Sequence, residues 1–364
     1  MTRRADDLLS GPRGRRVCLE VVLDAVGGDW RRLVWTRGSG GRYDPEQTRR
    51  SLAASIAALD LAAVRATARP DDWMPALLAA VDAARYWQEP GDEDRALAGP
   101  AMAAVLAPLA AAVARAPASQ WWAEPMAADD QHAVAFRDDD EATPGAPLLT
   151  GAGPALREWR EQAAAEEDRA RRERPADPRA DWSGEWWSTP ALTGRVVTTR
   201  SLPGTTPAEP RAPVRLPLVE DGMGWTTARS WPVHVPGDAC VLELTGPADW
   251  VALIERYPRE VTASRRHDWW RVAGWDGTWV VPDWAAVAED VDGVHLTVDG
   301  YLSTAGRALP VDVPALAGPA RTLLAGWDPD ATWWLTDAPA GLGAATDWRR
   351  RDEAPYSTWV AAGA

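Results

Sequence analysis

The segment 265–271 concentrates residue types that bind anions and transfer protons. It reads Arg-Arg-His-Asp-Trp-Trp-Arg, and the surrounding pattern favours a loop. Histidine and aspartate exchange protons, and arginine forms paired hydrogen bonds with carboxylates and phosphates. The same composition also suits a structural clasp in which guanidinium groups stack on indole rings. His267 and Asp268 are the catalytic candidates of this segment. Its ligand-binding candidates are Arg265, Arg266, Trp269 and Trp270.

The histidine of a predicted strand at 294–298 is a further candidate. Apolar and polar residues alternate there, which places His295 on the face opposite the three apolar side chains. We add His295 and Tyr301 to the ligand-binding candidates. A metal site formed by His234, His267 and His295 is an alternative, but their spacing matches no metal motif, and we expect no metal ligands.

The charge balance disfavours several classes of partner. The net charge is −14, whereas a nucleic-acid-binding protein needs a basic face to hold phosphates. The same acidity disfavours anionic membrane surfaces, and no apolar run has the length of a membrane span or the form of a signal peptide. We therefore expect a soluble cytoplasmic protein that binds another protein. The oligomeric state stays open.

Several sequence motifs of common enzyme classes are missing. The chain contains no lysine, which excludes a standard phosphate-binding loop. It also contains no Gly-x-Ser-x-Gly, Cys-x-x-Cys or His-Glu-x-x-His motif. These absences disfavour standard nucleotide-hydrolysing, esterase and zinc-dependent chemistry.

Tryptophan supplies most of the aromatic volume of this chain. There are 23 tryptophans but a single phenylalanine, Phe136, and the lack of Lys and Asn is typical of a GC-rich genome. A buried indole brings an N–H that needs an acceptor. We expect most of the tryptophans to fill the core.

The chain is predicted to be an α+β protein with a mainly helical N-terminal region. Alternation over 17–25, followed by a short apolar run at 33–35, favours a small β-hairpin. The predicted helices of this region, rich in Ala and Leu at helical spacing, cover 45–68, 73–88 and 100–115.

The second half is predicted to be a mixed, tryptophan-rich α+β domain. A charged helix at about 154–173 connects the two halves. The predicted strands cover 195–200, 239–245, 294–298 and 331–336, with short helices opening at Gly246-Pro247 and Pro282-Asp283. The expected limits are a helical domain at 1–140, an acidic loop and connecting helix at 141–180, the α+β domain at 181–345 and a tail at 346–364.

The order of these C-terminal elements resembles that of ADP-ribosyltransferase-like domains. The resembling parts are the strand at 239–245 with its helix, the helix after Pro282-Asp283, and the strands at 294–298 and 331–336. The resemblance implies NAD as cofactor, held by Arg200 at the end of the first core strand. It also implies a catalytic glutamate on a later strand. Glu243 lies on a strand but early in the order, and the last strand ends at Asp337, so the family pattern is not fully matched.

Two functions follow from these observations. The first is a non-catalytic interaction or scaffold protein, favoured by the missing enzyme motifs and by an acidity that suits a basic partner. The second is an ADP-ribosyltransferase-like, NAD-binding enzyme or degenerate relative that uses Arg200 and the segment around His267 and Asp268. The observation that separates the two is whether Arg200, His267, Asp268 and His295 converge on one cavity, because a scattered set would rule out the site.

Overall fold

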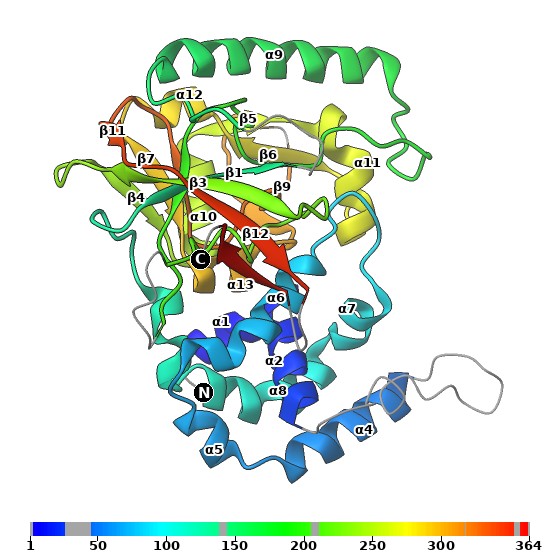
Figure 1. The fold of residues 1–364 in the computed structure, drawn as a ribbon. Coiled ribbons are helices and arrows are strands. Elements are labelled where there is room, and N and C mark those ends of the chain that lie inside the picture. Colours follow the sequence, from blue (N-terminus) through cyan, green and yellow to red (C-terminus); the bar gives the residue numbers. More distant parts are fainter. Residues whose placement is uncertain are drawn as a thin grey trace.

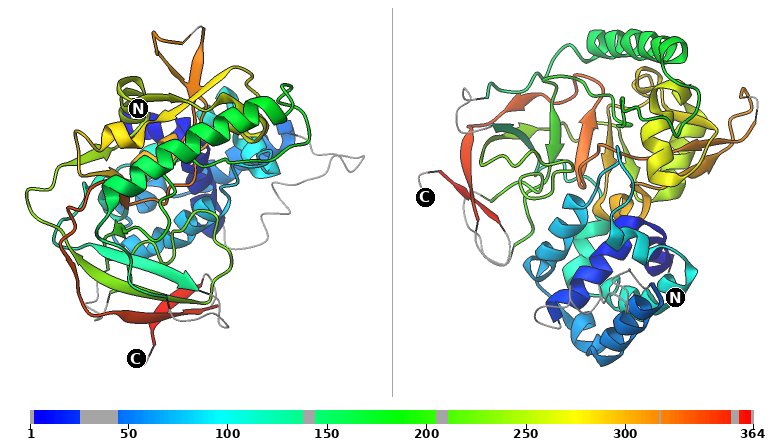
Figure 2. Two further views of the ribbon diagram at one scale, coloured as in Figure 1. Left: turned by 90° about the horizontal axis from the view of Figure 1, so that it is seen from above. Right: turned by 90° about the vertical axis from the view of Figure 1, so that its right-hand side faces the viewer.

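The computed structural model describes residues 3–25, 45–137, 144–204, 211–316, 318–352 and 357–362. Helices of the N-terminal region gather at one end of the molecule, and the sheets form the other end (Figure 1). A view from the side shows the same separation into a helical region and a sheet region (Figure 2). The predicted α+β class is confirmed.

Seven α-helices and two short 3-10 helices are described in the N-terminal region. They are α1 (Arg3–Ser10), α2 (Pro12–Ala25), α4 (Pro45–Ala58), α5 (Leu61–Ala66), η1 (Pro70–Trp73), α6 (Met74–Asp82), α7 (Asp92–Leu97), α8 (Pro100–Val113) and η2 (Pro117–Ala123). The helix predicted at 45–68 is interrupted after Ala58, and the carboxylate of Asp60 caps the resumed helix by accepting from the backbone N–H groups of Ala62 and Ala63.

The strand predicted at 17–25 is wrong, because these residues belong to α2. Helix α2 contacts α1, α6, α7, α8 and α13 (Val298–Thr304), so Val17, Leu19 and Val22 are all buried. An apolar run that is buried on most sides carries no reliable period, and the alternation was therefore misleading. The second half of the predicted hairpin, 33–35, lies outside the described residues.

Within the described residues, the larger sheet has nine strands, almost all antiparallel. Their order is β13-β12-β3-β1-β2-β10-β7-β4, with β11 paired to β3, and only β4 and β7 run parallel. The strands are β1 (His132–Arg137), β2 (Val197–Thr199), β3 (Thr227–His234), β4 (Val241–Leu244), β7 (Gly293–Leu296), β10 (Ala331–Trp334), β11 (Gly341–Leu342), β12 (Thr346–Arg351) and β13 (Thr358–Ala361).

Two segments join this sheet from outside the range expected for the α+β domain. Strand β1 lies within the first 140 residues, and it pairs with β3 along its whole length. Strands β12 and β13 lie in the expected tail, where β12 pairs with β3 over Thr346–Arg349. The buried Trp348 anchors β12 through a 2.7 Å hydrogen bond from its indole N–H to Ser230 Oγ. The sheet is thus assembled from both ends of the chain.

A smaller sheet and five helices complete the sheet region. The order of the smaller sheet is β5-β6-β9-β8. Its strands are β5 (Pro258–Glu260), β6 (Thr278–Pro282), β8 (Leu309–Val311) and β9 (Ala320–Thr322), and the helices besides α13 are α9 (Ala152–Glu173), α10 (Pro247–Arg256), α11 (Thr262–Ala273) and α12 (Trp284–Val287). Helix α9, the predicted connecting helix, lies across the end of the sheet region opposite the N-terminal helices (Figure 1).

The predicted strand at 294–298 is shorter than expected. Strand β7 ends at Leu296, and Thr297 caps α13 by accepting a 2.9 Å hydrogen bond from the N–H of Gly300. His295 therefore lies on a strand as expected, but Val298 begins a helix.

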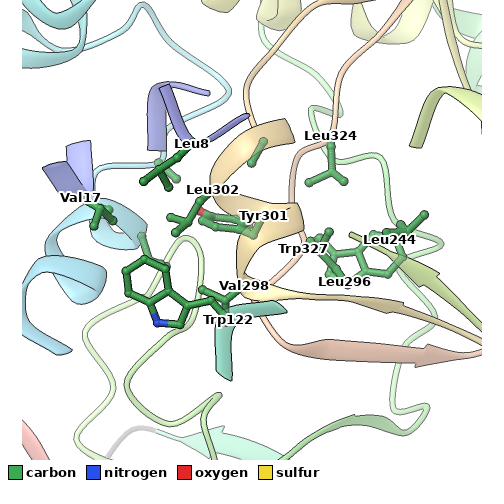
Figure 3. Close-up of a cluster of buried hydrophobic side chains, with 14 of the residues drawn as sticks. Leu8, Val17, Trp122, Leu244, Leu296, Val298, Tyr301, Leu302, Leu324 and Trp327 are labelled. Carbon is green, nitrogen blue, oxygen red and sulfur yellow. The ribbon is translucent and has the colours of Figure 1, made fainter. Parts of the chain in front are cut away.

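One continuous hydrophobic core joins the two regions through α13. Figure 3 shows Tyr301 and Leu302 of α13 between Leu8, Val17 and Trp122 of the helical region and Leu244, Leu324 and Trp327 of the sheet region. The contact is close, because a Cβ on Gly11 would lie 2.1 Å from the carbonyl oxygen of Leu302. Seven tryptophans are among the largest fully buried side chains: Trp122, Trp250, Trp269, Trp279, Trp284, Trp327 and Trp334.

No single helix within the described ranges is long and apolar enough to cross a membrane. Helices α8 and η2 satisfy the criteria of length and composition only as a pair, and the chain bends by 96° between them.

Candidate functional site

A chain of charged side chains crosses the interior of the larger sheet. His295 on β7 lies between two carboxylates: its Nδ1 is 2.6 Å from Glu243 Oε2 on β4, and its Nε2 is 3.5 Å from Asp330 Oδ1. Asp330 precedes β10 and accepts a 2.8 Å hydrogen bond from Arg200 Nε. The strand order β2-β10-β7-β4 explains the arrangement, because it brings these four residues side by side from distant parts of the sequence.

All three guanidinium nitrogens of Arg200 donate hydrogen bonds within the protein. Besides Asp330, its Nη1 donates to Glu124 Oε2 at 2.6 Å, and its Nη2 donates to the carbonyl oxygens of Glu124 and Pro125 at 3.3 Å and 2.5 Å. Glu243 is anchored to the same segment, since its Oε1 accepts from the N–H of Met126 at 3.0 Å. We call Glu124, Arg200, Glu243, His295 and Asp330 the His295 network.

The His295 network holds its histidine in the charged form. Burial alone would favour the neutral ring, but hydrogen bonds and negative charge from Asp330 and Glu243 outweigh it and raise the pKa of His295 to about 9. Burial also opposes the charge of Asp330, yet the interactions with His295 and Arg200 lower the pKa of this carboxyl. At neutral pH an imidazolium therefore donates to Glu243 and forms an ion pair with Asp330, and the protonated ring has no free nitrogen to act as a general base.

Asp330 is fixed in place by its backbone as well as by its charge. Its φ of 57° lies in the left-handed region, which aspartate tolerates better than most residues. Its Oδ2 accepts from the N–H of Arg200 at 3.0 Å and from Thr199 Oγ1 at 2.9 Å. The sequence analysis missed Asp330, because an acid in a turn gives no sign of partners that lie 35 and 130 residues away.

The segment 265–271 is helical, not a loop as predicted. It forms most of α11, and this helix buries Arg265, His267 and Asp268 beside Trp269. Because the buried face mixes charged and aromatic residues, the sequence shows no apolar helical stripe there.

Asp268 and its neighbours bind the segment 176–187. Asp268 accepts from Ser183 Oγ at 2.9 Å, from the N–H of Gly184 at 2.8 Å and from Arg271 Nη1 at 2.8 Å. Arg265 pairs with Glu185 at 2.6 Å and lies over the ring of Trp187. These contacts match the structural clasp that the sequence suggested as the alternative to an anion-binding site. We call the contacts between α11 and the segment 176–187 the α11 clasp.

The other candidates on α11 complete the clasp. Trp269 Nε1 donates to the carbonyl oxygen of Trp186 at 2.7 Å, and Arg266 Nη1 donates to that of Ala176 at 3.0 Å. The guanidinium carbon of Arg179 lies 5.2 Å from the ring centroid of Trp270. Five of the six neighbouring candidates, all except His267, thus hold one segment of the same chain.

His267 is buried without a polar partner. Its exposed fraction is 2%, and neither ring nitrogen has a hydrogen-bond partner among the described residues. Burial lowers the pKa of His267, and the charge of Arg266 adds to this effect. The neutral ring therefore packs as an apolar side chain.

The predicted site residues consequently fall into separate places. Arg200, Glu243 and His295 meet in the His295 network, whereas Asp268 belongs to the α11 clasp and His267 is buried on the same helix without a polar partner among the described residues. Tyr301 lies in neither, because it is fully buried on α13 beside Tyr86 and Glu220.

A cluster of serine, histidine and aspartate that was not predicted from the sequence lies where β1 begins and β2 ends. Ser201 Oγ donates to Asp130 Oδ1 at 2.7 Å and lies 3.1 Å from His132 Nε2. Asp130 Oδ1 contacts the same Nε2 at 3.2 Å. In a catalytic triad the acid holds Nδ1 and leaves Nε2 to the nucleophile, so this arrangement differs from a triad.

Asp130 in this cluster is firmly ionised. Although burial opposes its charge, hydrogen bonds from His132 and Ser201 and the charge of Arg211 lower its pKa to about 2. The Ser201 proton is therefore directed to a weakly basic carboxylate, which does not activate the hydroxyl group as a nucleophile.

Neither a metal site in the described part of the chain nor a related protein helps to assign a role to these features. Within the described residues, no group of three or more His, Cys, Asp or Glu side chains is arranged to hold a metal ion. The chain matches no protein-family model, no curated protein and no solved structure.

Proposed function

We propose that this protein is a non-catalytic interaction protein, in which the sheet region serves as a rigid scaffold. The observation that carries the proposal is the saturation of Arg200 and His295. The guanidinium group donates to Asp330, Glu124 and two backbone carbonyls, and both imidazole nitrogens face carboxylates. Groups bonded in this way stabilise a fold and leave no donor for a substrate.

Carboxylates that cap helices across the sheet region support the same function. Asp337 accepts from the N–H groups of Gly151 and Ala152 at the start of α9, at 2.9 Å and 2.8 Å. Glu167 of α9 accepts in turn from Ala263 and Ser264 at the start of α11, at 2.7 Å and 2.9 Å. Acids at helix N-termini are favourably placed against the helix dipole. The charged side chains thus tie the elements to one another.

The net charge of −14 indicates the kind of partner. A strongly acidic protein attracts a partner with a basic face, and such attraction weakens as salt screens it. We infer a protein partner with a basic surface, because the acidity disfavours nucleic acids and anionic membranes.

The test is recovery of the intact, tagged chain from its native host at low and at high salt. We expect one partner in stoichiometric amount at low salt and its release at about 0.5 M salt, where the Debye length is below 5 Å. Recovery of the chain alone at both salt concentrations would overturn the proposal.

An ADP-ribosyltransferase-like, NAD-binding function is the second candidate. In its favour, Arg200 just after β2, Glu243 on β4 and His295 on β7 meet in one network. The acids Glu243 and Glu124 of this network keep side-chain exposures of 28% and 56%. Binding of NAD would have to displace Glu124 from Arg200. His267 and Asp268 lie outside this network, so the candidate retains only its strand residues.

Calorimetry with NAD distinguishes the two functions. We expect no binding heat at millimolar NAD and no release of nicotinamide by the intact chain. Saturable binding that Glu124→Gln strengthens and Arg200→Gln abolishes would instead establish the second function, because the first change frees the guanidinium group and the second removes it.

A further inference from the structure

A cavity of about 530 Å³ lies where the helical region meets the sheet region. Its walls come from α2, from the chain around α6 and α7, from Val272 at the end of α11 and from Arg307 just after α13. Small-molecule sites have volumes of roughly 300 to 1,000 Å³. The cavity is therefore large enough for a small organic ligand, and none of the predicted site residues lines it.

Two arginines converge at one residue in this cavity. Arg15 Nη1 donates to the carbonyl oxygens of Leu9 and Ser10 at 2.9 Å and 3.1 Å. Arg307 Nη1 donates to Ser10 Oγ at 2.9 Å and to the carbonyl oxygen of Ser303 at 2.8 Å. All four acceptors are uncharged.

Among the described residues, Arg15 and Arg307 form no direct ion pair, and their nearest negative charges, Asp94 and Asp7, act on them only at longer range. Across the described parts of the chain, no carboxylate lies within 4.0 Å of a guanidinium nitrogen of Arg15 or Arg307. Burial lowers the pKa of both groups, although the charge of Asp94 opposes this shift for Arg15 and that of Asp7 opposes it for Arg307. For Arg15 the positive charges of Arg13 and Arg307 lower the pKa further. Two like charges that are held together and partly removed from water favour an anion between them.

Buried polar atoms without hydrogen-bond partners among the described residues belong to residues of this cavity. Arg15 Nε and Arg13 Nε are buried donors without an acceptor, and Asp94 Oδ1 is a buried acceptor without a donor. Arg13 and Asp94 do form an ion pair through other atoms. All three residues line the cavity. Each of these atoms has almost no exposed surface, so a ligand in the cavity cannot bond to it directly, and the atoms show only that this wall is rich in polar groups whose bonding is incomplete.

We propose that this cavity binds a small organic molecule carrying one phosphate group, which Arg15 and Arg307 hold. A carboxylate would neutralise only one of the two guanidinium charges, whereas a phosphate monoester carries a charge of about −1.5 to −2 and three acceptor oxygens. The proposal is independent of the partner protein proposed above.

The rest of the lining defines the organic part of the ligand. Tyr86 and Val272 offer apolar surface beside the arginines. Asp82 and Glu93 also line the cavity, and their negative charges disfavour a second phosphate while accepting hydrogen bonds from hydroxyl or amino groups. A phosphorylated polyol or amine fits this distribution.

The experiment measures thermal unfolding of the intact chain in inorganic phosphate and in glycerol 3-phosphate. Sodium chloride at equal ionic strength serves as the control. We expect a saturable rise of Tm with both phosphates and no comparable rise with chloride, because a ligand that binds only the folded state stabilises it. Glycerol 3-phosphate should bind more tightly than inorganic phosphate.

Variants locate the site. Arg15→Gln and Arg307→Gln should each weaken phosphate binding at least about tenfold, since each removes a charge-assisted hydrogen-bond donor. Arg65→Gln on the exposed face of α5 is the matched control and should bind as the wild type does. Equal effects of phosphate and chloride on the wild type, or unchanged binding by Arg307→Gln, would overturn the proposal.

Discussion

Two buried histidines, 28 residues apart in the sequence, have opposite environments. His295 lies between Glu243 and Asp330 and is charged, with its pKa raised to about 9. His267 is as deeply buried, but neither of its nitrogens has a partner in the described structure, and its pKa is lowered. The pair shows that burial alone does not determine the charge of a histidine. The carboxylates that strand pairing brings to the ring decide it.

The same contrast separates the two acids that accompany these histidines. Interactions with His295 and Arg200 lower the pKa of Asp330 despite its burial. Asp268 has donors of its own, but burial outweighs them and raises its pKa. Charged partners thus outweigh burial at Asp330, whereas burial outweighs the hydrogen-bond donors at Asp268.

The largest expected effect is that of Asp330→Asn. The change keeps a residue that tolerates positive φ but leaves the charges of His295 and Arg200 without their shared carboxylate. Removing one member of a buried ion pair costs about 3–5 kcal/mol. Urea denaturation should show a loss of that size in the free energy of unfolding. As a control, Asp352→Asn at the exposed ion pair with Arg350 should change it by less than about 1 kcal/mol.

The pH dependence of stability should differ between the two histidines. The pKa of His295 is raised from 6.5 to about 9, so its contribution is complete below about pH 6.5 and is lost as the pH rises through 9. The shift corresponds to about 3 kcal/mol. The pKa of His267 is lowered, so the protein instead loses stability as the pH falls below 6.5.

Denaturation curves between pH 5 and pH 10 check this difference. His295→Gln should flatten the decline between pH 6.5 and pH 9, and His267→Phe should reduce the decline on the acid side. If both variants showed the same dependence of stability on pH, the two histidines would not differ in charge as described.

Asp268→Asn should cost less than Asp330→Asn. The amide oxygen can still accept from the Gly184 N–H, and the new NH2 group can donate to Ser183 Oγ, so the main loss is the charged acceptor of Arg271. We expect a loss of about 1–2 kcal/mol in the free energy of unfolding. A loss as large as that of Asp330→Asn would show that the α11 clasp also depends on a charged carboxylate.

The smallest expected effect is that of His267→Phe. Because neither ring nitrogen is bonded, the substitution removes two unsatisfied polar atoms and keeps an aromatic ring. The free energy of unfolding should change by less than about 1 kcal/mol, or rise. A large loss would reveal a polar partner of His267.

The sequence predicted the positions of helices and strands where local signals were strong. Helices α9 and α10 and strands β4 and β10 were predicted close to their observed positions, since charge pattern, Gly-Pro-x-Asp and β-branched runs mark them. It failed for α2, whose apolar run is buried on most sides, and for α11, whose buried face is partly polar. Both failures arise because periodicity reports one apolar face, and neither helix has one.

The candidate site was predictable only as residue types. Arg200, Glu243 and His295 were named from the sequence, but nothing in it shows that Asp330 connects two of them. The strand order β2-β10-β7-β4 creates this contact, and pairing between distant strands is not visible in one sequence. The arginine cavity was missed for a similar reason, since Arg15 and Arg307 lie 292 residues apart in the chain.

The most direct test of the saturated His295 network is an NMR titration of the histidine side chains. The chain has only four histidines, so single substitutions can assign their signals. We predict that His295 is an imidazolium with both nitrogens protonated at pH 7.5 and titrates near pH 9, while His267 stays neutral at that pH. A neutral His295 at pH 7.5, with a free nitrogen, would contradict the scaffold function proposed for this region.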